Sequence, residues 1–198
     1  MKRVVVTLTM CLLVFSTPSF AAILNFDDLR GGGIKLDSYN GFSWGNFYSY
    51  FYDNYNLGYH NTLSPVSATA FIYNGCGTQS AMSIDSTSNF IFNGAYLTGW
   101  ANANNEWYAN AHSVTINGYL SGNKVSTYVA NLNLGRMNYF ATGWSTPVDK
   151  LVFTSDGNNK WFLMDNFTYN QTPVPVPSTA LLLGPCLVAI AFWRRMHT

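Results

Sequence analysis

The chain has 198 residues, of which 10% are charged and 17% are aromatic, and its net charge is +1. Residues 22–170 hold all nine acidic residues but only six of the ten basic ones, so this middle part has a net charge of −3. A nucleic-acid partner is therefore disfavoured, because phosphate binding requires a basic surface.

The first 21 residues have the features of a secretory signal peptide. Lys2 and Arg3 give a positively charged start, Val4–Phe15 is apolar, and Ser19–Ala21 is a small-x-small cleavage site. We expect signal peptidase to cut after Ala21 and the protein to be exported. Residue 22 is an alanine rather than a cysteine, which argues against a lipoprotein.

Residues 22–170 predict one all-β domain, an antiparallel β-sandwich of the jelly-roll kind. Short runs with period-2 alternation are separated by turn signals, and no segment has a long helical period. Val114 and Ile116 are expected on one face of their strand, and Gly122-Asn123 predicts a hairpin. The predicted strands are Ile23–Phe26, Gly41–Phe51, Ala68–Tyr73, Asn89–Asn93, Tyr96–Ala101, Ser113–Leu120, Val125–Leu132, Met137–Thr142, Lys150–Thr154 and Trp161–Tyr169.

Cysteine usage excludes a disulfide inside this domain. Cys11 lies in the signal peptide and Cys186 near the C-terminus, so Cys76 is the only cysteine of residues 22–170. An exported domain without a disulfide has to be held by packing, with or without a metal ion.

Two pairs of neighbouring residues with oxygen-bearing side chains, at opposite ends of the domain, predict a calcium site. Asp27 and Asp28 belong to the first strand region, and Asp165 and Asn166 belong to the last. In a jelly roll these strands can be neighbours, and carboxylate and amide oxygens are the ligands that Ca²⁺ prefers. The alternative is that these side chains cap strand ends and accept hydrogen bonds from backbone N–H groups.

Aromatic residues next to asparagines predict a sugar-binding surface. Trp107 and Tyr108 follow an Asn-rich loop and are the candidate ligand-binding residues. The apolar face of a pyranose packs on such rings while amides bond its hydroxyls. The alternative is that the rings belong to the core of the sandwich.

No catalytic motif is present in the sequence. The chain has no Gly-x-Ser-x-Gly, no His-Glu-x-x-His and no phosphate-binding glycine loop. Glu106 is the only glutamate, and His60 and His112 have no evident partner. We therefore expect a protein that is not an enzyme.

The C-terminus combines a Pro-rich linker with a hydrophobic helix. Residues 171–179 are followed by residues 180–198, an apolar run that ends in a basic pair. Counted from Val174, the stretch reaches the roughly 20 residues that a membrane-spanning helix needs. We expect this helix to engage the membrane, with the arginines on the cytoplasmic side.

The order of signal peptide, exported domain, motif, apolar helix and terminal arginines resembles bacterial proteins with a PEP-CTERM sorting signal. The residues that carry the likeness are Val174, Pro175, Pro177, Ser178, Thr179, Arg194 and Arg195, whereas Val176 stands where the family usually has Glu. The resemblance implies processing by an exosortase at the inner membrane, then delivery to the cell surface or an extracellular matrix.

The middle of the chain resembles galactose-binding-like and carbohydrate-binding-module jelly rolls. The likeness rests on short phrases such as Asn25–Leu29, Tyr39–Phe47, Val148–Phe153 and Met164–Phe167. It implies a non-catalytic protein of the cell surface or extracellular matrix, or alternatively a secreted module that binds extracellular polysaccharide. Exposed aromatic rings on one sheet would favour the second function, and fully buried rings the first.

Overall fold

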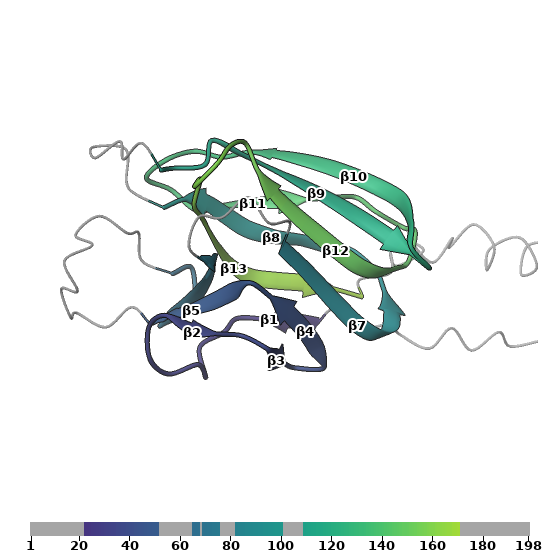
Figure 1. Ribbon diagram of the computed structural model, residues 1–198, viewed down its shortest axis with the longest axis horizontal. Helices are drawn as coiled ribbons and strands as arrows, with labels where there is room; N and C mark the ends of the chain where they lie inside the picture. The colour runs from purple at the N-terminus through teal and green to yellow at the C-terminus, as the bar shows by residue number, and fades with distance from the viewer. Residues whose placement is uncertain (1–21, 52–64, 68, 76–81, 101–108, 171–198) are drawn as a thin grey trace, which may run out of the picture.

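The computed structural model describes residues 22–51, 65–67, 69–75, 82–100 and 109–170 (Figure 1). They form two antiparallel sheets, which confirms the predicted all-β sandwich. The described residues contain no helix with the length and hydropathy of a membrane span. The predicted signal peptide, sorting motif and C-terminal helix lie outside the described residues.

One sheet has seven strands and the other has six. In the first the order is β11-β8-β13-β6-β5-β2, and β1 also pairs with β13. Its strands are β1 (Ala22–Leu24), β2 (Ile34–Lys35), β5 (Phe47–Phe51), β6 (Ala70–Asn74), β8 (Phe92–Gly99), β11 (Asn138–Ala141) and β13 (Phe162–Tyr169). The second has the order β10-β9-β12-β7-β4-β3. Its strands are β3 (Ser38–Tyr39), β4 (Phe42–Gly45), β7 (Met82–Phe90), β9 (Ser113–Leu120), β10 (Asn123–Asn131) and β12 (Val148–Ser155).

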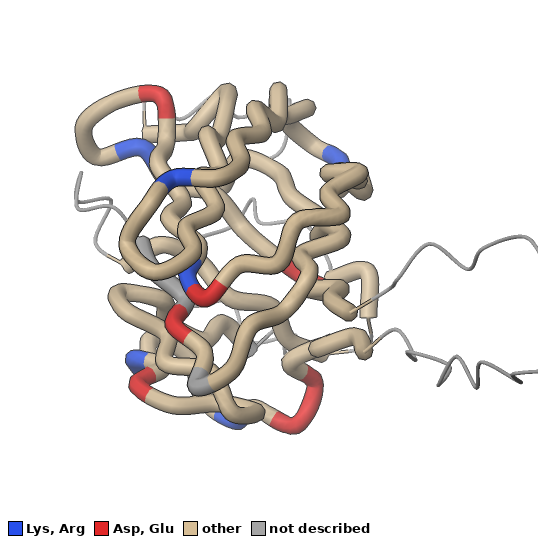
Figure 2. Tube along the Cα trace, turned by 90° about the vertical axis from the view of Figure 1, so that its right-hand side faces the viewer, with Lys and Arg blue, Asp and Glu red and all other residues tan. Residues whose placement is uncertain are grey.

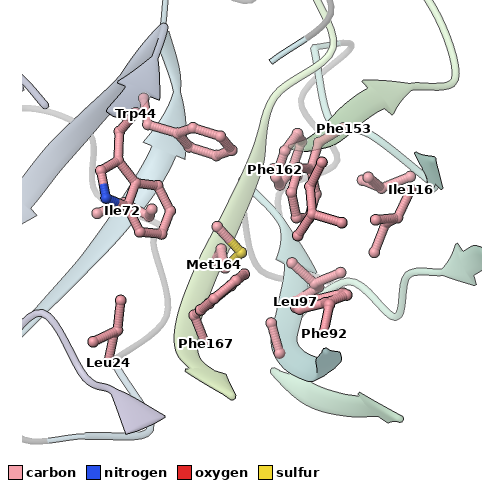
Figure 3. Packing of buried hydrophobic residues seen from close by; sticks show 14 of the residues in the cluster. Leu24, Trp44, Ile72, Phe92, Leu97, Ile116, Phe153, Phe162, Met164 and Phe167 are labelled. Carbon is pink, nitrogen blue, oxygen red and sulfur yellow. The ribbon is translucent and has the colours of Figure 1, made fainter. Parts of the chain in front are cut away.

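The main hydrophobic core lies between the two sheets and is rich in aromatic rings. Phe167 of β13 lies between Trp44 and Phe92, with ring centroids 5.6 and 4.9 Å away (Figure 3). Phe47 and Phe153 join the two sheets in an edge contact at 5.7 Å. Such pairs add about 0.5–1.5 kcal/mol each beyond the burial of their area. All five of these side chains are buried.

The chain passes from one sheet to the other at two short breaks. The predicted strand Gly41–Phe51 is in fact two strands, β4 in the six-stranded sheet and β5 in the seven-stranded one. The break is at Asn46, which has φ 56°, a conformation that asparagine tolerates better than most residues. Phe42 and Trp44 are buried as expected, but Asn46 does not continue their face.

The second break also differs from the prediction. Instead of two strands at Asn89–Asn93 and Tyr96–Ala101, β7 ends at Phe90 and β8 starts at Phe92 in the other sheet. Gly94 lies inside β8, although in the sequence this glycine suggests a turn between two strands. The greater part of β7 was not predicted, because its sequence is dominated by serine, threonine and aspartate; its two neighbours, β4 and β12, supply the pairing.

The predicted hairpin and its strand faces are confirmed, but the turn lies one residue earlier than Gly122-Asn123 and β10 begins at Asn123 instead of Val125. Residues Ser121 and Gly122, with φ of 51° and 80°, form the two-residue turn between β9 and β10. Positive φ at both positions is the geometry that suits the twist of paired strands. Val114 and Ile116 both point into the core, as their alternation indicates.

Gly94 allows β11 to lie directly against β8, which gives a test of the packing. Its φ is 153°, and a Cβ added there would meet the Phe140 carbonyl oxygen at 2.3 Å. Gly41 also has a positive φ, 79°, but a Cβ added there meets nothing within 4 Å. Gly41→Ala therefore isolates the backbone strain, roughly 1–2 kcal/mol. We expect Gly94→Ala to lower the free energy of unfolding by about 1–3 kcal/mol more than that, because it also overpacks the site. Urea denaturation measures both variants; equal losses would contradict the close approach.

Candidate functional site

The structure brings one member of each predicted ligand pair, Asp27 and Asp165, to the same place. Strand β1 pairs with β13, with Leu24 opposite Phe167, so the first and last strands are neighbours as expected. Asp27 follows β1 and Asp165 belongs to β13, and both side chains contact the hydroxyl of Ser67. We call Asp27, Ser67 and Asp165 the carboxylate clamp.

Asp165 is fully buried and accepts hydrogen bonds from three backbone N–H groups. These come from Val66 at 2.8 Å, Ser67 at 2.9 Å and Asn166 at 2.7 Å. Burial raises the pKa of the Asp165 carboxyl above its ordinary value, and these N–H donors oppose that shift. The side chain therefore fixes Val66 and Ser67 against the last strand, β13.

Asp27 fixes the start of β6 in the same way. Its Oδ1 accepts the N–H of Thr69 at 2.7 Å and that of Ala70 at 3.2 Å. These contacts lie where β13 changes its neighbour on one side. Leu163 and Met164 of β13 pair with β6, and the residues from Phe167 onwards pair with β1. The clamp therefore joins the end of β1, the residues before β6 and the middle of β13, at a place where the sheet has no continuous ladder of backbone hydrogen bonds.

The oxygens of the clamp are compatible with a hard cation. The Ser67 hydroxyl oxygen lies 3.0 Å from the Asn25 carbonyl, 3.1 Å from Asp27 Oδ1 and 3.0 Å from Asp165 Oδ1. One hydroxyl has one hydrogen, so it serves one of these acceptors at a time. Calcium, held by Asp27, Asp165 and the Asn25 carbonyl, would offset the charge of the two carboxylates. Within the described residues no group of three His, Cys, Asp or Glu side chains could hold a metal ion, so carbonyl and hydroxyl oxygens would have to complete the shell.

The other two predicted ligands are not part of this cluster. The Asp28 carboxylate accepts a hydrogen bond from the hydroxyl of Tyr39. Burial and this bond raise the pKa of Tyr39 well above its ordinary value. Asn166 has φ 48° at an irregularity of β13 and contributes its backbone N–H to Asp165.

A second feature, which the sequence analysis missed, is a set of rings on the outer face of the seven-stranded sheet. Residues of β5, β6, β8, β11 and β13, or directly beside their ends, that alternate with core residues point away from the core. We call this set the aromatic face; it consists of Tyr48, Tyr50, Phe71, Tyr73, Tyr96, Trp100, Tyr139 and Trp161, packed with Met137 and Leu163. The signal was present in the sequence, because Tyr-Ser-Tyr of β5 and Phe-Ile-Tyr of β6 place a ring at every second position.

The rings at one end of the aromatic face form a continuous network. Tyr50 stacks on Phe71 with centroids 4.9 Å apart, and Tyr73 stacks on Trp161 at 5.6 Å. Trp100 meets Trp161 edge to face at 4.9 Å. Phe71 is fully buried and Trp100 is 5% exposed, whereas Tyr50, Tyr73 and Trp161 are half-buried. The half-buried rings therefore cover the inner ones and are themselves accessible.

The other end of the aromatic face is more open. Tyr139 of the edge strand β11 is 40% exposed and lies 5.2 Å from Tyr96. A Cβ added at Gly94 would meet the Tyr139 hydroxyl oxygen at 2.9 Å, so this ring lies over a position that has no side chain. Asp165, the carboxylate opposite Tyr96, is buried and bonded within the clamp. It is therefore not placed to exchange protons with a bound molecule.

The described surface carries few charges. Lys and Arg are spread over turns and strands rather than gathered on one face (Figure 2). Two ion pairs, Lys35–Asp37 and Lys150–Asp85, are both exposed. Trp107 and Tyr108, the predicted ligand-binding residues, lie outside the described residues.

Comparison with known proteins finds similarity at the level of solved structures. No protein-family model and no curated protein matches the chain. A point mutant of CBM29-2, a family 29 carbohydrate-binding module, is similar with a TM-score of 0.42 and 14% identity, covering 76% of this chain and 91% of that one. The CBM22-1–GH10 part of xylanase 10B from Clostridium thermocellum, complexed with xylohexaose, has a TM-score of 0.40 and 10% identity. That match covers 72% of this chain and 28% of the xylanase chain. Because these values are low, the function has to be argued from this chain's own residues.

Calcium at the clamp is tested by thermal melting of the domain. An ion that binds only the folded state at a hundredfold excess over its dissociation constant stabilises it by about 2.7 kcal/mol. We therefore expect millimolar calcium to raise the melting temperature of the wild type by several degrees relative to EDTA. Asp165→Asn and Asp27→Asn should lose this rise, and Asp28→Asn, outside the cluster, should keep it. An unchanged wild-type midpoint would mean that hydrogen bonds alone hold the clamp.

Proposed function

We propose that residues 22–170 form a non-catalytic module that binds polysaccharide on the aromatic face. The observation that carries this proposal is the set of accessible rings across the seven-stranded sheet. Tyr139 and Tyr96 lie at one end, and Tyr73, Tyr50 and Trp161 lie at the other. Neighbouring strands are about 4.8 Å apart, so rings from β11 to β5 extend over a length that a chain of several sugars can follow.

The chemistry of the rings suits a sugar chain. Each half-buried Tyr or Trp offers an apolar surface for the C–H groups of a pyranose, and the tyrosine hydroxyls add hydrogen bonds. The rings are fixed by one another and by the sheet, as the Tyr73–Trp161 stack shows. A site whose rings are already ordered loses little conformational entropy when it binds.

The non-catalytic part of the proposal rests on the same surface. Hydrolysis of a glycosidic bond normally needs a pair of carboxyl groups on either side of the bond. Asp165, the carboxylate that β13 contributes to this side of the sheet, is buried and accepts three backbone N–H groups. Its hydrogen bonds support a structural role.

The targeting part of the proposal rests on the sequence of both ends. We propose that the protein is exported with a signal peptide, sorted through a PEP-CTERM tail by an exosortase at the inner membrane, and delivered to the cell surface or extracellular matrix. A module that binds polysaccharide would there be attached to the polymers that surround the cell. A structural component of the matrix with no sugar ligand is the second candidate, favoured by the complete burial of Phe71 and Leu163 beneath the outer rings.

Affinity electrophoresis in gels containing xylan, a β-glucan, a mannan or alginate tests the binding. We expect at least one of these polymers to retard the protein. Trp161→Ala and Tyr139→Ala should each weaken the retardation by roughly tenfold, because truncating a ring that packs on the sugar costs more than 1 kcal/mol.

The matched control is Tyr119→Ala. Tyr119 is a half-buried ring of β9, which belongs to the six-stranded sheet. Ile116 and Gly118 face the core, so Tyr119 lies on the opposite, outer face of that sheet. It should leave the retardation unchanged. Failure of all four polymers to retard the wild type, or equal losses in the three variants, would favour the structural component.

Processing of both ends predicts the mass of the exported protein. In a host with an exosortase we expect a mature chain that begins at Ala22 and lacks Arg194 and Arg195. Intact-mass spectrometry of the surface or culture fraction measures this. A Pro177→Ala variant should accumulate with its tail, since the motif would no longer be recognised. Recovery of wild-type protein that still ends at Thr198 would make the tail a permanent anchor.

A further inference from the structure

Strand β10 is a long unpaired edge of the six-stranded sheet. It has nine residues, Asn123–Asn131, and in the part of the chain that the structure describes its only neighbour is β9. It forms the upper border of that sheet in Figure 1. The other described edge strands, β1, β2, β3 and β11, have two to four residues. A long free edge presents backbone donors and acceptors to which another strand can pair.

The register of β10 identifies which of its backbone groups are free. The Leu132 N–H donates to the His112 carbonyl, one position beyond the pair Asn131–Ser113. In an antiparallel ladder hydrogen-bonded pairs alternate with pairs that are not hydrogen-bonded to each other. Ala130 and Tyr128 therefore bond to β9, whereas Thr127, Val129 and Asn131 direct their N–H and C=O groups outwards.

The outward residues lack the features that normally block an edge. Proteins protect such edges with lysine, proline or a β-bulge. In β10 the one lysine, Lys124, and the irregularity that follows it lie at the start of the strand. The stretch Thr127–Asn131 has no charge and no proline, and its central residue, Val129, is 51% exposed.

We propose that β10 pairs antiparallel with β10 of a second copy of this chain, across a two-fold axis at Val129. The three outward residues are symmetric about Val129, so the axis places Val129 opposite its own copy and Thr127 opposite Asn131. Each outward donor then meets an acceptor, and both exposed valines lose contact with water. The two Lys124 side chains lie beyond the paired stretch, so no like charges face each other. Such an isologous contact closes on itself and joins the two six-stranded sheets into one.

Cysteine cross-linking tests this register in the full chain. In a background in which Cys11, Cys76 and Cys186 are replaced by alanine, Val129→Cys should form an intermolecular disulfide on mild oxidation. The Cα atoms of a hydrogen-bonded antiparallel pair are about 5.5 Å apart, within the range that a disulfide spans.

Thr127→Cys is the matched control on the same strand. The single variant should not cross-link, because Thr127 faces Asn131 of the partner. The double variant Thr127→Cys/Asn131→Cys should cross-link, because each new cysteine then faces the other cysteine of the partner. No dimer with Val129→Cys would overturn the proposal. Equal cross-linking of the Val129→Cys and Thr127→Cys single variants would overturn it as well, since it would indicate random collision.

A proline at the axis provides a second measurement. Val129→Pro removes an outward N–H and leaves the ladder to β9 intact, as proline is tolerated on an edge. It should abolish the dimer of the full chain in sedimentation analysis, whereas Val129→Thr should keep it. Circular dichroism checks that both variants retain the fold, and a Val129→Pro variant that is folded and still dimeric would refute the pairing.

Discussion

Strand β13 needs two different neighbours on one of its sides, and the rest of the structure depends on how this is resolved. It pairs with β6 at Leu163 and Met164 and with β1 from Phe167 onwards. Asp165 lies at the change, and its hydrogen bonds to residues 66 and 67 replace the missing ladder. A buried carboxylate without such partners would be strongly destabilising. The domain has no internal disulfide, so this polar contact links segments that are 98 residues apart.

The same region separates the two faces of the sheet. On the inner side, Met164 and Phe167 pack into the main core. On the outer side, Leu163 packs under the rings of β5, β6 and β8. A central strand that is apolar on both sides is typical of a sheet covered on both faces. Here the second cover consists of the half-buried tyrosines and tryptophans of the aromatic face, which can serve packing and binding at once.

The proposed binding surface and the proposed pairing edge belong to different sheets. The aromatic face belongs to the seven-stranded sheet, and the free edge of β10 belongs to the six-stranded one. Pairing at that edge would leave the rings of both copies accessible. A dimer with two such faces would bind a polymer at two points, which raises its apparent affinity without any new contact. At the extracellular matrix, where we propose that the protein is delivered, such a dimer would link polymer chains.

The sequence by itself determined the fold class and the strand and hairpin at Ser113–Leu120. These follow from period-2 alternation and glycine in turns, which are local properties. The likeness to jelly rolls predicted that the first and last strands are neighbours, but the structure decided that Asp27 and Asp165, rather than Asp28 and Asn166, come together. Only the tertiary structure decided that Asn46 and Ile91 divide runs of strand between two sheets, and that Ser67 joins the two acids. It also decided that Tyr73, Trp100 and Trp161 gather on one face. The alternation of residue types shows that certain rings share one side of a strand. Which side faces the core depends on the neighbouring strands, and these lie far away in the sequence.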